Sequence, residues 1–112
     1  MTLISLNSCQ LNWYGDIDLG SDFYYLVEPA FNSIVIPVNP KKPYESSIYV
    51  IKEIESLGFN ENLILATSKS EQEIKYWRID KKSESKQLGY KENSIMELSN
   101  VSQIDSTEFH QI

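Results

Sequence analysis

Five segments of the chain have apolar patterns that predict β-strands, either alternating apolar positions or short apolar runs rich in β-branched and aromatic residues. These segments are residues 22–28, 31–38, 47–59, 62–68 and 73–80. The first, DFYYLVE, is apolar on both alternating faces, which predicts a central strand. Pro37 cannot donate to a β-ladder, so the second strand lies at an edge of the sheet or ends there. The last two segments predict a hairpin with a four-residue connection at 69–72.

The segment 47–59 fits two elements. A helix would align Val50, Ile54 and Leu57 on one stripe and would end at Gly58. The density of β-branched residues favours a strand instead, because such side chains lose rotamer freedom in a helix. We therefore predict a strand and keep the helix as the alternative.

The C-terminal part of the chain carries two helix signals. Ser94 with Glu97, and Asp105 with Glu108, have the three-residue spacing of capping boxes. Each pair predicts the start of a short helix. The second helix is too short to be stable alone, so it must dock on the sheet or fray. The preceding residues 81–93 are charged and predict a flexible connection.

Composition is consistent with one small folded domain. The chain has 112 residues, of which 41% are hydrophobic, 23% charged and 12% aromatic. These values are those of an ordinary globular protein, and the aromatic content suits β-structure. We predict an α+β fold: a mostly antiparallel β-meander of about five strands with short C-terminal helices. The domain is expected to span residues 22–112, and residues 1–21 form a signal remnant or tether.

Charge narrows the class of partner. Sixteen acidic residues face ten basic ones, which gives a net charge of −6. The basic clusters are two residues long, at 41–42 and 81–82. A nucleic-acid-binding domain needs a basic stripe to neutralise phosphates, so this class is excluded. An acidic surface favours a basic protein partner.

Residues suited to catalysis are scarce. Cys9 is the single cysteine, which excludes an internal disulfide and a Cys-rich zinc site. His110 is the single histidine and lies near the C-terminus, a poor place for a positioned base. The four glycines are isolated, so no phosphate-binding loop is present. The sequence predicts no catalytic site, no cofactor and no metal, and hence a protein that is not an enzyme.

Acidic residues at 16, 18 and 22 resemble a calcium-binding loop in spacing. The EF-hand pattern requires glycine at its sixth position and glutamate at its twelfth. Counted from Asp16, these positions are Ser21 and Val27, and both fail. We interpret the segment as a turn whose carboxylates accept hydrogen bonds from the backbone.

Two kinds of residue are candidates for binding a protein partner. One kind is the aromatic pair before the first strand, and the other is two glutamate pairs with a spacing of two. On a strand, such a spacing places both carboxylates on one solvated face. Most other aromatic residues are assigned to the core. The candidates are Trp13, Tyr14, Glu53, Glu55, Glu71 and Glu73.

Basic residues flank the aromatic pair at 76–77. Lys75 and Arg78 could contact a single-stranded nucleic acid together with these rings. The acidic net charge favours a different role for them. We predict a cross-strand ion pair with Glu71 or Glu73.

The N-terminus resembles the lipid-attachment motif of bacterial lipoproteins. Leu6, Asn7, Ser8 and Cys9 supply an aliphatic residue, a variable residue, a small residue and the cysteine that would carry the lipid. The eight residues before Cys9 include no basic residue, so the match to a signal peptide is partial. The alternative is a buried thiol that acts as a small hydrophobe. No run of about 18 apolar residues exists, so any membrane contact would depend on a lipid at Cys9.

The middle of the chain resembles a group of small bacterial lipoproteins of the Bacteroidota type, over residues 16–82. The shared features are an Asp-Leu-Gly segment, an aromatic strand, a strand of the Ile-Ile-Ala type and a Tyr-Trp-x-Ile-Asp-Lys strand, in which x is any residue. They lie here at residues 18–20, 24–26, 64–66 and 76–81. The resemblance implies a β-rich fold and an envelope location, and it carries no activity.

These features lead to one expected function and one alternative. We expect a non-enzymatic envelope binding protein of the immunity type, which neutralises a partner toxin, possessing a lipid anchor at Cys9. The alternative is a structural or accessory lipoprotein that contacts another envelope component through exposed aromatic residues. If the motif at Cys9 is accidental, the protein is cytoplasmic.

Overall fold

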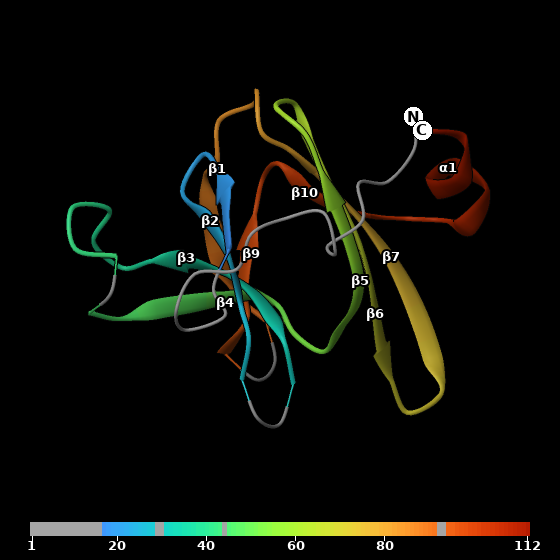
Figure 1. Cartoon of the computed structure of the whole chain (residues 1–112), viewed down its shortest axis with the longest axis horizontal. Coiled ribbons are helices and arrows are strands. Elements are labelled where there is room, and N and C mark those ends of the chain that lie inside the picture. The colour runs from blue at the N-terminus through green and yellow to red at the C-terminus, as the bar shows by residue number, and fades with distance from the viewer. Residues whose placement is uncertain (1–16, 29–30, 44, 92–93) are drawn as a thin grey trace.

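The computed structural model describes residues 17–28, 31–43, 45–91 and 94–112. These residues form ten strands and one helix, arranged in two four-stranded sheets and one two-stranded sheet (Figure 1). All strand pairs within the sheets are antiparallel. The elements are β1 (Ile17–Gly20), β2 (Phe23–Leu26), β3 (Ser33–Pro37), β4 (Ser47–Ile51), β5 (Ile54–Phe59), β6 (Leu63–Ser70), β7 (Glu73–Asp80), β8 (Gln87–Tyr90), β9 (Met96–Leu98), β10 (Val101–Ile104) and α1 (Ser106–Gln111).

The first sheet has the order β1-β2-β3-β4, so each strand pairs with its neighbour in sequence. The predicted strand 22–28 is β2, and its central position is confirmed. Pro37 is the last residue of β3, where β3 pairs with β4 alone, so the missing N–H removes no hydrogen bond to β2. Ser21 and Asp22 connect β1 to β2 with φ angles of 54° and 67°, the left-handed conformation of tight hairpin turns.

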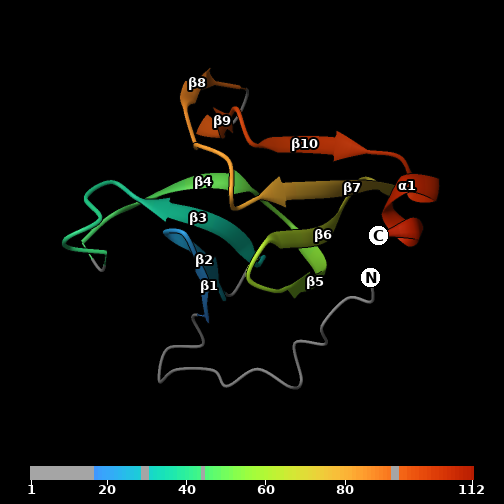
Figure 2. The same cartoon turned by 90° about the horizontal axis from the view of Figure 1, so that it is seen from above.

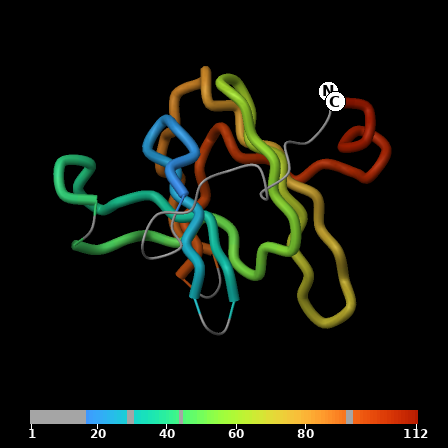
Figure 3. Tube along the Cα trace, in the orientation of Figure 1, coloured from blue at the N-terminus to red at the C-terminus, as the bar shows by residue number. Residues whose placement is uncertain are grey.

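The second sheet has the order β10-β7-β6-β5. Its centre is the predicted hairpin of β6 and β7, which projects beyond the other strands of this sheet (Figure 3). The connection has two residues instead of four, because β6 continues to Ser70. Glu71 and Gln72 have φ angles of 51° and 73°, as a two-residue turn requires.

The segment 47–59 is extended, so the preference for strand over helix is confirmed. It is not one strand, however. β4 ends the first sheet at Ile51, and β5 begins the second sheet at Ile54. We call the two residues between them, Lys52 and Glu53, the crossover. The chain bends there because Glu53 has a φ of 58°, outside the range of a regular strand.

The core lies between the two large sheets. It is composed of apolar side chains from both sheets and from β9: Ile17, Leu19, Phe23, Tyr25, Ile34, Val50, Ile51, Ile54, Leu57, Ile64, Ala66, Ile79, Met96 and Leu98. Packing of these side chains removes apolar surface from water, which is the main stabilising term of such a domain. The chain thus builds two sheets that contribute to one core, rather than a single meander.

The five-strand meander is therefore too simple a prediction. β-Rich, antiparallel structure is confirmed, but the chain changes sheet at the crossover and forms additional short strands. One of these, β8, lies in the segment predicted as a flexible connection. Another, β1, lies within the predicted tether 1–21 and buries Ile17 and Leu19, so the folded part begins before residue 22.

One of the two predicted C-terminal helices is confirmed. Asp105 caps α1, its carboxylate accepting a hydrogen bond from the Glu108 N–H at 2.7 Å, and Phe109 is buried. The helix predicted at Ser94 is wrong. Ser94 has a φ of 60° instead of the extended conformation of an N-cap, and Met96 leads into β9.

The two-stranded sheet lies beside the first sheet. Figure 2 shows β8 and β9 on the side of β4, where Tyr49 and Ile95 form a parallel bridge. In β9, Met96 and Leu98 are buried and Glu97 between them is exposed. This alternation is the pattern of a strand with one face on the core. In the described part of the chain, no helix is long and apolar enough to cross a bilayer.

A lysine joins the first hairpin to the second sheet. The Lys81 ammonium donates a hydrogen bond to the Leu19 carbonyl at 2.5 Å and lies 5.7 Å from the centre of the Phe59 ring. Burial lowers the pKa of Lys81. A Cβ atom at Gly20 would lie 2.9 Å from this ammonium, and the φ of Gly20 is 88°. Glycine at this position therefore allows both the turn and the close approach of Lys81.

Candidate functional site

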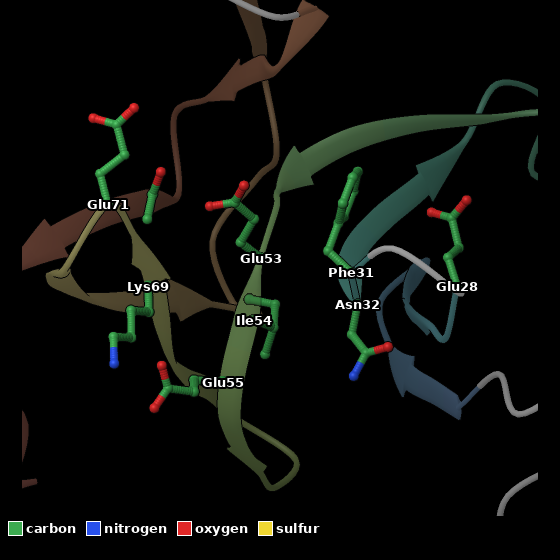
Figure 4. A pocket seen from close by; sticks show the side chains of 9 residues that line it. Glu28, Phe31, Asn32, Glu53, Ile54, Glu55, Lys69 and Glu71 are labelled. Atoms are coloured by element: carbon green, nitrogen blue, oxygen red, sulfur yellow. The ribbon is translucent and has the colours of Figure 1, made fainter.

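An open hollow of about 660 Å³ lies between the end of the first sheet and the β6–β7 hairpin. We call it the glutamate hollow, because four of the described residues around it are glutamates. Figure 4 shows Glu71 and Lys69 on the hairpin side, and Phe31, Asn32 and Glu28 on the side of the first sheet. Its lining residues are Glu28, Phe31, Asn32, Glu53, Ile54, Glu55, Lys69, Ser70 and Glu71.

Each glutamate stands where the regular strand geometry is interrupted. Glu28 follows the end of β2. Glu53 belongs to the crossover, and Glu71 to the β6–β7 turn, both with positive φ. Glu55 lies in a bulge, since Ile54 pairs with Ser68 and Ser56 with Thr67. Turns and bulges redirect side chains away from strict alternation, and these four glutamates therefore line one hollow although they belong to different elements.

Backbone hydrogen bonds hold the two walls of the glutamate hollow together. The Ile54 N–H donates to the Asn32 carbonyl at 2.9 Å, which ties the crossover to the first sheet. The Lys69 N–H donates to the Glu53 carbonyl at 3.0 Å, which ties it to β6. The positions of the glutamates are therefore set by main-chain contacts to both sheets.

Glu28 is oriented by a neighbouring tyrosine. The Tyr49 hydroxyl donates a hydrogen bond to Glu28 Oε1 at 2.9 Å. This bond to the carboxylate, together with burial and the negative charge of Glu28, raises the pKa of Tyr49. The Lys52 ammonium lies 4.7 Å from the centre of the Tyr49 ring and 5.8 Å from that of Phe31, in cation–π contact. Glu28 is thus part of a small polar and aromatic cluster.

The structure brings together three of the four predicted partner-binding glutamates. Glu53, Glu55 and Glu71 line the glutamate hollow, whereas Glu73 does not. The prediction that each pair shares a strand face is wrong, because Glu53 and Glu71 lie in the crossover and in a turn. The other candidates, Cys9, Trp13 and Tyr14, lie outside the described residues.

Glu28 was missed from the sequence. Its position between an apolar strand and Pro29 identified only the end of that strand. Its place beside the glutamate hollow depends on how β2 and β3 pair, because this pairing sets where Asn32 meets Ile54. Strand pairing of this kind is not encoded in the spacing of the residues themselves.

The predicted ion pair at Lys75 and Arg78 is not formed among the described residues. The β6–β7 register pairs Lys75 with Ser68 and Arg78 with Leu65. The described ion pairs lie elsewhere, between Lys42 and Glu45 at 3.5 Å and between Lys91 and Glu97 at 3.3 Å. The register places Ser68 and Leu65 opposite the two cations, so neither Glu71 nor Glu73 faces Lys75 or Arg78 across the strands.

Asp18 and Asp22 of the predicted acidic turn are among the described residues, and Asp18 has the expected role. Asp18 Oδ1 accepts a hydrogen bond from the Gly20 N–H at 2.9 Å. In the described ranges, no group of three or more acidic, histidine or cysteine side chains is arranged to hold a metal ion. Four glutamates line the glutamate hollow, and carboxylates bind positively charged groups through charge-assisted hydrogen bonds.

Aromatic residues divide between the core and its margin. Phe23 and Tyr25 are buried, as expected for most of the set, and burial raises the pKa of Tyr25. Tyr76 packs on Phe109 with ring centres 5.0 Å apart, which docks α1 on the second sheet. His110 also contacts Tyr76, at 6.0 Å, and its Nδ1 lies 2.7 Å from the Ser106 carbonyl. The terminal helix is thus docked rather than frayed.

Comparison of the chain with family models, curated proteins and solved structures gives no match.

Proposed function

We propose that this protein is a non-enzymatic binding protein of the bacterial cell envelope, of the immunity type, which neutralises a basic partner toxin. The observation that supports it is that Glu28, Glu53, Glu55 and Glu71, from three separate segments of the chain, line one hollow. Lys69 is the one cationic side chain among its described lining residues. An acidic hollow on a chain of net charge −6 attracts a basic surface.

The mechanism is capture of a basic protrusion. Arginine suits such a hollow, because its planar guanidinium donates paired hydrogen bonds to carboxylates. The Phe31 ring adds an apolar surface against which the stem of such a side chain can pack. A hollow of about 660 Å³ admits a few side chains only, so the remaining contact area must come from the surrounding surface.

The envelope location rests on sequence features. The lipoprotein-like residues ending at Cys9 and the resemblance over residues 16–82 support it. A lipid on Cys9 would leave a short tether before β1, which begins at Ile17. The bound partner would then be held close to the membrane surface.

The test measures the association rate with the protein encoded directly beside this gene. We expect the rate to fall steeply as salt is added, because steering by charge is screened. The triple variant E53Q/E55Q/E71Q is expected to associate about tenfold or more slowly at low salt and to lose most of the salt dependence. Surface plasmon resonance at several ionic strengths measures both quantities.

A matched control removes the same number of charges elsewhere. Glu61, Glu84 and Glu108 are exposed and do not line the glutamate hollow. The variant E61Q/E84Q/E108Q is expected to stay within about threefold of the natural protein, since distant charges contribute weakly to steering. Equal loss in both triple variants, or a rate insensitive to salt, would contradict the proposal.

The accessory role is a second candidate, favoured by one surface feature. In β8, Leu88 and Tyr90 are 58% and 64% exposed, and among the described strands β8 pairs with β9 alone. An exposed strand edge with apolar side chains is a docking surface for an added strand. If L88S/Y90S abolishes binding and the glutamate triple variant does not, the accessory role replaces the immunity role.

A further inference from the structure

A second hollow, of about 470 Å³, adjoins the crossover and shares Glu53 and Ser70 with the glutamate hollow. We call it the Trp77 pocket. It lies between β4 and the inner face of the second sheet, near Lys91 and Ile95. Its described lining residues are Val50, Ile51, Lys52, Glu53, Ser68, Ser70, Lys75, Trp77, Lys91, Ile95 and Gln103.

The inner face of the second sheet changes character along its strands. On β7, alternation places Lys75, Trp77 and Ile79 on one face, and Ile79 is fully buried in the core. The register pairs Ile79 with Ile64, which is also buried, but pairs Lys75 with Ser68. The face that forms the core at one end is therefore polar at the other end.

The neighbouring strand shows the same change. On β10, Val101 pairs with Ile79, and Gln103 pairs with Trp77. Val101 packs against the core, whereas Gln103 lines the Trp77 pocket. Polar side chains from three strands thus surround a pocket whose inner wall is the edge of the apolar core. This arrangement suits a ligand with both an apolar and a polar part.

The indole of Trp77 is held in a defined orientation. Its Nε1–H donates a hydrogen bond to Ser68 Oγ at 2.9 Å. The Lys91 ammonium lies 5.6 Å from the centre of the ring, and Glu97 holds this ammonium at 3.3 Å. A fixed ring beside a cation offers an apolar surface next to a positive charge.

Positive charge predominates in this pocket. Three of its described lining residues are lysines and one is a glutamate, although the whole chain carries a net charge of −6. The Lys52 ammonium is directed to the Tyr49 and Phe31 rings, so its contribution to the pocket is its alkyl stem. Lys75, half-buried on β7, supplies one charge that a ligand would meet, and Lys91 supplies a second that it shares with Glu97.

From this geometry we infer that the Trp77 pocket binds a small organic acid with a flat apolar body. The carboxylate pairs with the Lys75 and Lys91 ammoniums, and Gln103 and Ser70 supply further donors. The apolar body packs on Trp77, Val50 and Ile95. The pocket volume of about 470 Å³ lies within the range of small-molecule sites. The inference does not rest on the proposed function of the glutamate hollow, although the two hollows share Glu53 and Ser70.

The test is calorimetric titration of the full chain with phenylacetate and with phenylacetamide. The two probes share a ring and differ in charge. We expect saturable one-to-one binding of the acid and binding of the neutral amide that is about tenfold weaker or more, because the amide forms no charge-assisted bond with lysine. No saturable binding of the acid at millimolar concentration, or equal binding of both probes, would overturn the inference.

Two variants locate the binding. K75Q should weaken phenylacetate binding about tenfold, the effect of one lost charge-assisted hydrogen bond. K86Q removes the same charge from an exposed residue outside the pocket and should leave the affinity unchanged. The Nε1–H resonance of Trp77, assigned through W77F, should shift on titration in the natural protein. Equal affinity of K75Q and K86Q, or an unmoved Trp77 resonance, would place the acid elsewhere and refute the site.

Discussion

The two hollows beside the crossover carry opposite charge and are built in different ways. The glutamate hollow gathers its carboxylates from a strand end, a crossover, a bulge and a turn. The Trp77 pocket gathers Lys75, Trp77 and Gln103 from regular strand faces. Regular alternation determines which side of a sheet a residue occupies, whereas each interruption redirects one side chain. The acidic site therefore depends on backbone irregularities, and the basic site on strand register.

The crossover is the element that both hollows share. Lys52 and Glu53 are adjacent in sequence, and Glu53 lines both hollows. Hydrogen bonds from Ile54 to Asn32 and from Lys69 to Glu53 hold this segment against both sheets. Substitutions at and beside the crossover should therefore distinguish a loss of stability, which affects both hollows, from a change confined to one hollow.

The largest expected effect is the loss of stability in Ile51→Ala, which should affect both hollows. Ile51 is 2% exposed, pairs with Ile34 and directly precedes the crossover. Truncation of a buried isoleucine leaves a cavity and should lower the free energy of unfolding by about 2–5 kcal/mol. Urea denaturation measures this change, and both binding activities should weaken together. Ile74→Ala, the same change at a side chain that is 47% exposed, should cost less than about 1 kcal/mol.

A smaller effect is expected from the backbone of Glu53. Its φ of 58° is costly for a β-branched residue and free of strain for glycine. E53V should be about 1–2 kcal/mol less stable to urea than E53G, because both variants remove the carboxylate and differ in this backbone preference. Equal stability of the two variants would show that the crossover relaxes without strain and does not hold the hollows in place.

The smallest effect on stability is expected from Tyr49→Phe, which removes the hydrogen bond to Glu28 beside the glutamate hollow. Loss of the hydrogen bond to Glu28 should reduce stability at neutral pH by less than about 1 kcal/mol. The natural protein should lose stability as the pH rises above 10.0. The pKa of Tyr49 is raised in the fold, so the unfolded tyrosine ionises first and favours unfolding.

Chemical denaturation at a series of pH values measures this dependence. The curve for Y49F should be flatter above pH 10.0, with a remaining slope from Tyr25, whose pKa burial raises. Phenylacetate binding should be unchanged, because Tyr49 does not line the Trp77 pocket. Y90F serves as the control, since Tyr90 is 64% exposed. A Y49F curve identical to that of the natural protein would rule out the assigned role of the Glu28 bond.

Local sequence signals predicted the central hairpin and one cap correctly. β6, β7 and the Asp105 cap depend on contacts between residues near in sequence. The failed cap at Ser94 shows the limit of such signals. Its three-residue spacing was as good as that of Asp105, but Met96 and Leu98 bury their side chains beside β4 and pull the segment into a strand. Tertiary burial outweighs a cap worth about 1 kcal/mol.

Three of the residues in the glutamate hollow were named from the sequence, and the reason given for them was incomplete. Glu53, Glu55 and Glu71 were expected on flat strand faces, and a bulge and two positive φ angles place them together instead. Glu28 and the lysines of the Trp77 pocket were not associated with these sites. Lys75 and Lys91 lie sixteen positions apart in the sequence. That both line the Trp77 pocket depends on how β7 and the two-stranded sheet of β8 and β9 are placed.

The sequence alone determined the antiparallel β-rich character, the acidic net charge and the presence of a single cysteine and a single histidine. Composition and the alternation of apolar residues are local properties, and they do not depend on which strands pair with each other. Only the tertiary structure decided that the chain changes sheet at Lys52 and Glu53, and that opposite charges collect on two hollows there. Sheet order is decided by burial of one shared core between residues distant in sequence, which no local pattern records.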